Sequence, residues 1–517
     1  MSEEQISVQH NLFDAVPVER FQILSKEELV ELCKQHQKII VTVTKDNDRL
    51  RALNEELKQK SLLIEDQYVT IKNKLFGKSS ERSSKPKPAG GGGDKSKKKK
   101  VLLPSERYPN APLIERHITL DNPACGCCGS HMEDSGMTEE SEYLTKIPAQ
   151  YYVVVQVKHK YRCASCHGDI KTAPTPPRVI EGGSYSDEMV IDVACSKYCD
   201  LIPIERQAQM AAREGLKGLP PHSLIEATHY LAQYLEGAYK ILKFEILENL
   251  IFHADETPHR MLEGDKKNNW FLWGFSTKTT SYFECHSTRS GEVASMLLTD
   301  SKCQYLVSDV YSGYSKAVGD TNKIRLSRGD PLIKHVFCNA HPRRYFKQAQ
   351  DRFPEASFFI KQYRKIYRLE KLAQKNPDIR LKIRARMTKY FEKMKTKCIA
   401  DVGGYSSKSG LGKAMSYFLK NYEGLTRFIM NADLPIDNNP QERLLRSHVI
   451  GRKTWYGTHS KLGAKTAAIL FSLVESCKLN GVNPRAYLKS LVSDLHLGIG
   501  PYTPYQFKVA QETRARS

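Results

Sequence analysis

Three acidic residues in this chain stand in contexts that suit them to chemistry. Asp255 and Asp309 each follow a short apolar run, and Glu442 follows an Asn-Asn-Pro sequence. The apolar runs are typical of buried strands. Asn439 as an N-cap and Pro440 at the first helical position predict the start of a helix. We therefore expect two aspartates at strand ends and one glutamate in the first turn of a helix.

Carboxylates held in this way are suited to binding divalent metal. Magnesium prefers hard oxygen ligands and usually takes a few carboxylates plus substrate phosphates. Two such ions about 4 Å apart can clamp the attacking and leaving oxygens of a phosphodiester. Asp255, Asp309 and Glu442 therefore predict a site for two magnesium or manganese ions. Glu256 is interpreted as a neighbour rather than a ligand, and Asp437 as an alternative that could be a helix cap.

The ordered motifs of most of the chain resemble the insertion-sequence-66 transposase family, TnpC type. The resemblance is carried by the paired Cys-x-x-Cys motifs and by the segments 75–81, 255–257, 309–314, 338–344, 438–443, 451–455 and 480–484. It implies an RNase H-like catalytic domain whose Asp-Asp-Glu triad is Asp255, Asp309 and Glu442. It also implies cleavage at the ends of a DNA element, transfer of the freed 3′-hydroxyl to target DNA, and a need for accessory proteins of the same element.

Two other functions compete with transposition. An RNase H-like nuclease that cuts without strand transfer would use the same triad, so its products alone would distinguish it. A zinc-dependent DNA-binding regulator with an inert core belongs to a different class. The intact acidic residues in all three motifs argue against that second alternative.

Two Cys-x-x-Cys pairs predict a structural metal site. Four cysteines from such pairs can close a tetrahedral thiolate site for one zinc ion, and the expected ligands are Cys125, Cys128, Cys163 and Cys166. The competing ligands nearby are Cys127, His131 and His167. The resemblance implies a zinc-finger-like DNA-binding domain here. Cys338 and His341 have Cys-x-x-His spacing, which is interpreted either as a second metal site or as core packing.

A long helix is predicted from about Lys26 to Leu75, with Ser25 and Glu28 as a capping box. Apolar residues recur along it at seven-residue spacing, namely Val43, Leu50, Leu57, Ile64 and Ile71. A heptad sustained over this length predicts a coiled coil and hence self-association. Packing of the helix on its own chain is the alternative.

The region around the three acidic residues is predicted to be a β-rich core with a helical insertion. A hairpin at 270–275 and 281–285, a helix near 291–298 and the strand before Asp309 come in that order. The long basic stretch that follows is interpreted as an insertion that forms a DNA channel. The expected DNA-binding residues are Arg343, Arg344, Arg364, Lys365, Arg368, Arg446, Arg452 and Lys453.

Composition favours a polyanionic partner. The net charge is +21, from 79 basic and 58 acidic residues, and each cation that meets a phosphate releases condensed counterions. No apolar run approaches a membrane span, so no membrane partner is expected. The start of the sequence lacks the pattern of a signal peptide, and disulfides are not expected among the 13 cysteines. We expect a bacterial cytoplasmic protein associated with the nucleoid.

Together these observations predict a multidomain α+β protein. Its expected partners are double-stranded DNA, both element ends and target, and further copies of itself in a homo-oligomer. The predicted regions are a coiled-coil oligomerisation region at 1–80, a flexible basic linker at 81–100, a zinc-finger-like β unit at 101–178, a helical region at 179–248 that forms a helix-turn-helix or a brace, an RNase H-like catalytic domain at 249–495 with an insertion at about 340–430, and a tail at 496–517.

Overall fold

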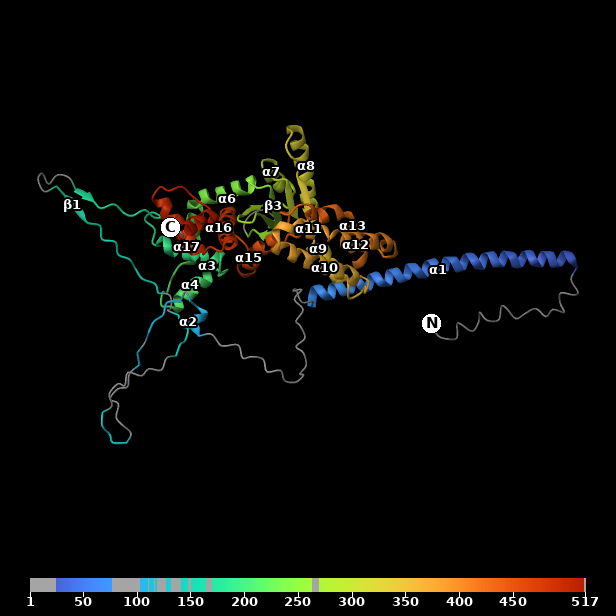
Figure 1. Cartoon of the computed structure of the whole chain (residues 1–517), viewed down its shortest axis with the longest axis horizontal. Helices are drawn as coiled ribbons and strands as arrows, with labels where there is room; N and C mark the ends of the chain where they lie inside the picture. Colours follow the sequence, from blue (N-terminus) through green and yellow to red (C-terminus); the bar gives the residue numbers. More distant parts are fainter. Residues whose placement is uncertain are drawn as a thin grey trace. The chain divides into compact units, whose positions relative to one another are not determined.

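The computed structural model describes most of the chain (Figure 1). The described residues are 25–76, 103–109, 111–115, 117–118, 127–131, 141–146, 150–163, 170–262 and 269–515. The predicted linker at 81–100, and Cys125 and Cys166 of the predicted zinc site, lie outside them. The chain divides into two compact units, of which the first comprises Met1–Lys78, Pro177–Gln207 and Pro221–Ser517 and the second comprises Ser79–Pro176 and Ala208–Pro220.

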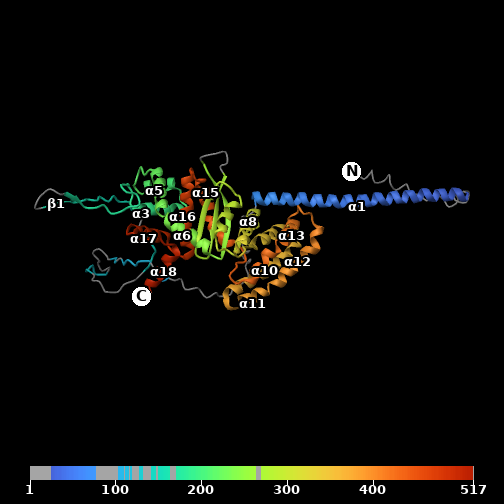
Figure 2. The ribbon, with the colours of Figure 1, turned by 90° about the horizontal axis from the view of Figure 1, so that it is seen from above.

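A five-stranded mixed sheet organises the first unit, with strand order β5-β4-β3-β6-β7. The first three strands form an antiparallel meander, and β6 and β7 then add in parallel to β3. Figure 2 shows these strands side by side, next to α6 and α16. The predicted hairpin is confirmed by the pairing of β4 with β5. The bounds are β3 Ile251–Arg260, β4 Asn269–Ser276, β5 Ser281–His286, β6 Tyr305–Ser308 and β7 Lys334–Phe337, with α7 Glu292–Thr299 before β6 and α8 Ser312–Arg328 before β7.

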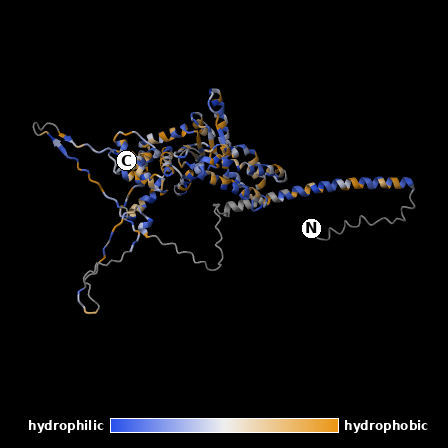
Figure 3. Cartoon of the chain, viewed as in Figure 1, coloured by the Kyte–Doolittle hydropathy of each residue, from blue (hydrophilic) through white to orange (hydrophobic). Residues whose placement is uncertain are grey.

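The N-terminal helix α1 spans Lys26–Phe76. The predicted capping box is confirmed, because the Ser25 N–H donates to Glu28 Oε2 at 2.8 Å and the Glu28 N–H donates to Ser25 Oγ at 3.3 Å. Figure 3 shows hydrophobic residues interspersed with hydrophilic ones along the described part of α1. Four members of the heptad series are more than half exposed, namely Val43, Leu50, Leu57 and Ile64. The side chain of Ile71 lies outside the described part. None of the described helices is long and apolar enough to cross a membrane.

The second unit contains α2 (Pro104–Arg107) and a small antiparallel hairpin of β1 (Lys160–Arg162) and β2 (Ile170–Thr172). Cys163 follows β1 directly, so the second cysteine pair begins the connection between the two strands. The apolar run at 151–155 is rich in residues that favour strands, but the structure has no strand there. High β-propensity does not make a strand when no neighbouring strand pairs with it.

The helices that precede the sheet pack into the core of the first unit. These core helices are α3 (Asp187–Tyr198), α5 (Pro221–Tyr234) and α6 (Glu236–Glu248). Helix α4, which comes between α3 and α5 in the sequence, spans Ile204–Arg213. Helix α3 begins after Ser186, whose Oγ accepts the Met189 N–H at 3.2 Å. Helices α5 and α6 meet at the buried residue Leu235.

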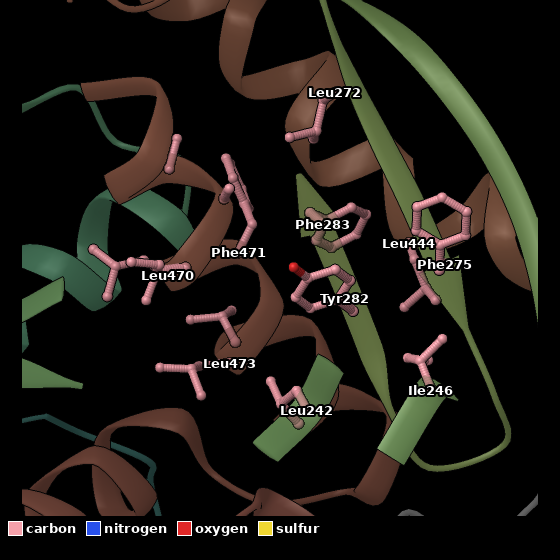
Figure 4. Packing of buried hydrophobic residues seen from close by; sticks show 14 of the residues in the cluster. Leu242, Ile246, Leu272, Phe275, Tyr282, Phe283, Leu444, Leu470, Phe471 and Leu473 are labelled. Carbon is pink, nitrogen blue, oxygen red and sulfur yellow. The ribbon is translucent and has the colours of Figure 1, made fainter. Parts of the chain in front are cut away.

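A long apolar helix, α16 (Lys461–Asn480), covers the edge strand β5. Ser472 Oγ accepts the Phe283 N–H at 2.8 Å, and Ser476 Oγ accepts the Ser281 N–H at 2.9 Å. These side chains satisfy backbone donors that an edge strand would otherwise leave unpaired. Figure 4 shows Phe471 and Leu473 packed with Tyr282, Leu242 and their neighbours in this core.

The predicted helical insertion is present between β7 and α15 (Asn439–Trp455), and its apolar core is shared with Val307 of β6 and Val336 of β7. Its helices are α9 Ala340–Ala349, α10 Ala356–Lys375, α11 Arg380–Ala385, α12 Thr388–Asp401, α13 Gly410–Lys420 and α14 Tyr422–Thr426. After α16 come α17 (Pro484–His496) and α18 (Pro504–Arg514). The C-terminal tail therefore contains a helix, and Phe507 of that helix packs on Tyr487 with ring centroids 5.7 Å apart.

A buried ion pair in the insertion generates a stability prediction. Arg384 is fully buried and donates to both carboxylate oxygens of Glu370, at 2.9 and 2.6 Å. Glu370→Ala should lower the free energy of unfolding by about 3–5 kcal/mol, because it leaves a buried cation without its partner. Glu423→Ala is the matched control, since Glu423 is exposed in its pair with Arg427 and its removal should cost about 0–1 kcal/mol. Equal effects of the two variants in urea unfolding would contradict this account.

Candidate active site

The pairing of β3 with β6 brings the two predicted aspartates together. The parallel register aligns His253 with Val307. Continued for two residues, the same register places Asp255 across from Asp309, and neighbouring strands lie about 4.8 Å apart. Asp309 follows β6 directly, and its Oδ1 accepts the Tyr311 N–H at 3.0 Å. The first turn of α8 therefore holds this carboxylate in place.

The third predicted carboxylate, Glu442, lies in the first turn of α15, as expected. The N-cap, however, is Asn438 rather than Asn439, and it makes no side-chain cap bond. Its side chain binds the sheet instead. Asn438 Nδ2 donates to the Ala254 carbonyl at 2.9 Å, and Asn438 Oδ1 lies 2.7 Å from His253 Nδ1. This bridge fixes the start of the helix beside Asp255.

A glycine on β4 allows this helix to approach the sheet. Gly274 is the partner of Asp255 across β3 and β4. A Cβ at Gly274 would lie 2.2 Å from Gln441 Nε2 and 2.8 Å from Phe283 Cε1. Because Gln441 is buried beside this position, any larger residue would push the first turn of α15 away from the strand. Neither Gly274 nor Gln441 was singled out from the sequence, because only the tertiary approach of the helix gives them a role.

The carboxylates affect one another electrostatically. Burial raises the pKa of Asp255 well above its ordinary value, and the negative charges of Glu256, Asp309 and Glu442 raise this pKa further. One hydrogen bond, from the Glu256 N–H to Asp255 Oδ1 at 3.0 Å, acts in the opposite direction. A cluster of this kind is repulsive when all its members are ionised. A divalent cation among the carboxylates would remove that repulsion.

The carboxylate of Glu256 is hydrogen-bonded to other side chains and does not face the other carboxylates as a shared metal ligand would. Its buried side chain accepts from Tyr314 Oη at 2.5 Å and from Arg289 Nε and Nη2 at 2.8 and 2.6 Å. The Arg289 guanidinium lies 4.2 Å from the ring centroid of Tyr311, the residue whose N–H holds Asp309. Glu256 thus connects β3 to the turn that carries Asp309. Arg289 is a further basic residue at the site, and no sequence motif indicated it.

Asp437, the alternative third carboxylate, is also held by other groups. Its Oδ1 accepts the Asn439 N–H at 3.2 Å, and its Oδ2 accepts from Tyr367 Oη at 3.1 Å. These bonds place Asp437 at the entry to α15, where it accepts a backbone donor at the helix start.

Two basic side chains of α9 lie beside Glu442. His341 Nε2 is 3.8 Å from Glu442 Oε1, and Arg344 Nη2 is 3.7 Å from Glu442 Oε2. Cys338 completes the neighbourhood, because the possible ligand atoms of Cys338, His341 and Glu442 all lie within 4.8 Å of one another. Arg344 was expected to contact DNA, and the structure places it next to the third carboxylate.

The other predicted DNA-binding residues either contact other groups or are exposed. Arg343 lies over the ring of Tyr367 at 5.6 Å. On α15, Arg452 donates to the carbonyl of Pro258. The remaining predicted DNA-binding side chains are exposed on α10 and α15, namely Arg364, Lys365, Arg368, Arg446 and Lys453.

Comparisons with known proteins agree with the motifs. Residues 182–466 match the family described as "Transposase IS66 family", and residues 122–167 match the "zinc-finger binding domain of transposase IS66". The second match contains both Cys-x-x-Cys pairs. Two similar proteins come from Sinorhizobium fredii (strain NBRC 101917 / NGR234). "Uncharacterized protein y4hP" is 25% identical over 408 residues, which cover 74% of this chain and 72% of the relative. "Uncharacterized protein y4jD" is 27% identical over 395 residues, which cover 73% and 76%.

The repulsion among the carboxylates generates a stability prediction. In EDTA at neutral pH, Asp255→Asn should raise the melting temperature, because it removes a buried charge that three neighbouring carboxylates oppose. Each 1 kcal/mol of relief corresponds to about 2–4 °C for a domain of this size. The matched control is Asp378→Asn, at an exposed position in the insertion, and it should change stability by less than about 0.5 kcal/mol. A lower melting temperature for Asp255→Asn would contradict the repulsion.

Proposed function

Because the chain belongs to the IS66 transposase family, we propose that residues 249–495 form an RNase H-like catalytic domain that cleaves the ends of a DNA element and transfers them to target DNA. The strand order supports this proposal. An antiparallel meander of β3, β4 and β5 is followed by β6 and β7, which add in parallel on the other side of β3. Helices α7 and α8 make the connections to those two strands.

The observation that carries the proposal is the convergence of Asp255, Asp309 and Glu442. They come from two adjacent parallel strands and one helix start, and their charges act on a single carboxyl group. The three side chains offer only oxygen atoms, which suits magnesium or manganese. Glu442 Oε1 is also buried without a hydrogen-bond partner among the described residues. These residues therefore fit a site for two divalent ions.

In this proposal the protein supplies position and charge rather than a covalent intermediate. When bound, the divalent ions would activate the attacking oxygen and stabilise the leaving oxygen. Asn438 holds Glu442 beside the strand that carries Asp255, and Tyr311 holds Asp309. Arg289 and Arg344 lie at the carboxylates and supply positive charge where a DNA phosphate would approach.

The zinc-finger domain supplies a second part of the function. Its family match spans both cysteine pairs, and we propose that one structural zinc is bound by Cys125, Cys128, Cys163 and Cys166. Cys128 and Cys163, the two described members, are exposed. A zinc-ordered unit of this kind would recognise the element ends, while the catalytic domain acts on them.

The remaining parts of the proposal concern assembly. Transposition requires two ends in one complex and an active site for each. The exposed apolar stripe of α1 supports a coiled coil that joins at least two copies. The proposed setting is the bacterial cytoplasm at the nucleoid, where accessory proteins of the same element would join the complex.

The triad provides the direct test of the function. Purified protein is incubated with labelled element-end DNA and manganese, and cleaved and joined products are separated. Asp255→Ala, Asp309→Ala and Glu442→Ala should each abolish both products while leaving DNA binding intact, since each removes an oxygen that water cannot replace in position. Asp378→Ala serves as the charge-matched control. Cleavage without joining in the unmodified protein would identify a nuclease, and normal cleavage by one variant would remove that residue from the triad.

The basic face of α10 gives a second test. Neutralising Arg364, Lys365 and Arg368 together should weaken binding to many DNA sequences alike, because phosphate contacts do not read sequence. The slope of log affinity against log salt should fall by about 0.9 for each phosphate that the variant no longer neutralises. Neutralising Lys316, Lys323 and Arg328 on α8 removes the same charge outside the insertion and should leave the slope near its original value. An unchanged slope in the α10 variant would show that this face is only solvated.

The N-terminal helix gives a third test. A peptide of residues 25–76 should be helical and self-associated, because the stripe through Leu50 and Leu57 would otherwise face water. The same peptide with Leu50→Lys and Leu57→Lys should be monomeric. Sedimentation equilibrium measures both, and a monomeric unmodified peptide at high concentration would count against the coiled coil.

A further inference from the structure

Three side chains of different chemistry meet at the base of the helical insertion. Cys338 follows β7 directly, His341 lies in the first turn of α9, and Glu442 lies in the first turn of α15. Their possible ligand atoms all lie within 4.8 Å of one another. The Cys-x-x-His spacing places two of them around one helix start, and the adjacent start of α15 supplies the third.

The distances within this cluster suit a shared cation better than direct hydrogen bonds. His341 Nε2 and Glu442 Oε1 are 3.8 Å apart, which is too long for a hydrogen bond. Two ligand atoms on one tetrahedral zinc ion, with bonds of about 2.1 Å, are separated by about 3.4 Å. The observed separation is therefore close to that of two ligands across a metal ion.

Two atoms of the cluster also lack the partners that buried polar atoms normally have. Glu442 Oε1 and His341 Nδ1 are buried without a hydrogen-bond partner in the part of the chain that the structure describes. Buried polar atoms without partners are uncommon in folded proteins, and an ion is one of the ordinary reasons for them. A histidine binds one ion through one of its two ring nitrogens, so with Nε2 toward Glu442 it is the unpartnered Glu442 Oε1 that indicates a shared ion. Arg344 lies 3.7 Å from the other oxygen, Oε2, so Oε1 is the oxygen available to a cation in this cluster.

Cys338 is a buried thiol whose sulfur accepts a backbone hydrogen bond. Its Sγ accepts the Asn438 N–H at 3.1 Å, and the N-termini of α9 and α15 both lie beside it. Burial raises the pKa of this thiol to about 12, and the backbone N–H donors act in the opposite direction. A bound divalent cation would take the place of the thiol proton, since a coordinating thiol is deprotonated.

We propose that Cys338, His341 and Glu442 form a second metal site, for zinc or another thiophilic divalent cation, separate from the zinc finger. Thiolate, imidazole and carboxylate are the ligands that zinc takes, and three protein ligands leave the fourth position open. The sulfur ligand distinguishes this site from an oxygen-only magnesium site. The proposed zinc site does not require the proposed transposition, although both proposals use Glu442. A zinc ion bound there would join the base of the insertion to α15.

The test is the zinc content of the full-length protein. After treatment with chelator and reconstitution with zinc alone, the unmodified protein should hold one more zinc per chain than Cys338→Ser or His341→Gln. Cys398→Ser is the matched control, because Cys398 is another buried cysteine of the insertion and lies outside this cluster. Its zinc content should equal that of the unmodified protein. With cobalt in place of zinc, the thiolate-to-metal absorption should be weaker in Cys338→Ser than in this control.

A second measurement covers the case in which the cysteine variant does not fold. His341 is partly exposed, so His341→Gln should keep the fold, as circular dichroism can verify. Zinc should raise the melting temperature of the unmodified protein more than that of His341→Gln, because a ligand stabilises only the state that binds it. Equal zinc content and equal thermal shifts would overturn the site. Neither readout involves DNA cleavage, so failure of this proposal and failure of the proposed function remain distinguishable.

Discussion

The candidate site depends on one side chain, that of Asn438. Its amide group contacts the Ala254 carbonyl and His253 on β3, while its backbone N–H contacts Cys338 Sγ after β7. Cys338 and Asn438 are separated in sequence by the whole helical insertion. Closing a chain segment of that length costs conformational entropy, and the hydrogen bonds of Asn438 determine where its two ends meet. These bonds act together with the packing of Gln441 at Gly274 and the bond from Arg452 to the Pro258 carbonyl to hold α15, and hence Glu442, against β3.

The hydrogen bonds of Asn438 also determine the electrostatics of the site, because they bring the charge of Glu442 close to Asp255. Burial and the neighbouring carboxylates raise the pKa of Asp255 well above its ordinary value. Arg289 is paired with Glu256 and Arg344 lies 3.7 Å from Glu442, so each offsets the charge of one outer carboxylate, and neither forms an ion pair with Asp255 in the described structure. An arrangement that lowers the stability of the metal-free protein is typical of sites selected for function rather than for stability.

The sequence predicts the parts of this site that depend on local pattern. The apolar runs before Asp255 and Asp309 predicted the strands, and the Asn-Asn-Pro sequence predicted the helix start. Asp309 follows its strand as expected, but Asp255 lies within β3 rather than at its end, because pairing with β4 continues the strand to Arg260. The N-cap was predicted one residue too late. The side chain of Asn438 binds the sheet rather than its own helix, and capping rules consider only bonds within the helix. The run at 151–155 has strand propensity but no pairing partner in the described structure. The roles of Arg289 and Gly274 likewise arise only from tertiary contacts, in the pair with Glu256 and in the approach of Gln441.

The insertion is joined to the candidate site by direct hydrogen bonds. Asn339, at its beginning, donates to the carbonyls of Leu425 and Ile436 near its end, at 2.8 and 3.1 Å. These bonds join its two ends directly below α15. A short linker in place of the insertion would remove His341 and Arg344 from Glu442 and leave Asn339 without its acceptors. Asn339 and Asn438 thus connect the two ends of the insertion with each other and with β3 through direct hydrogen bonds.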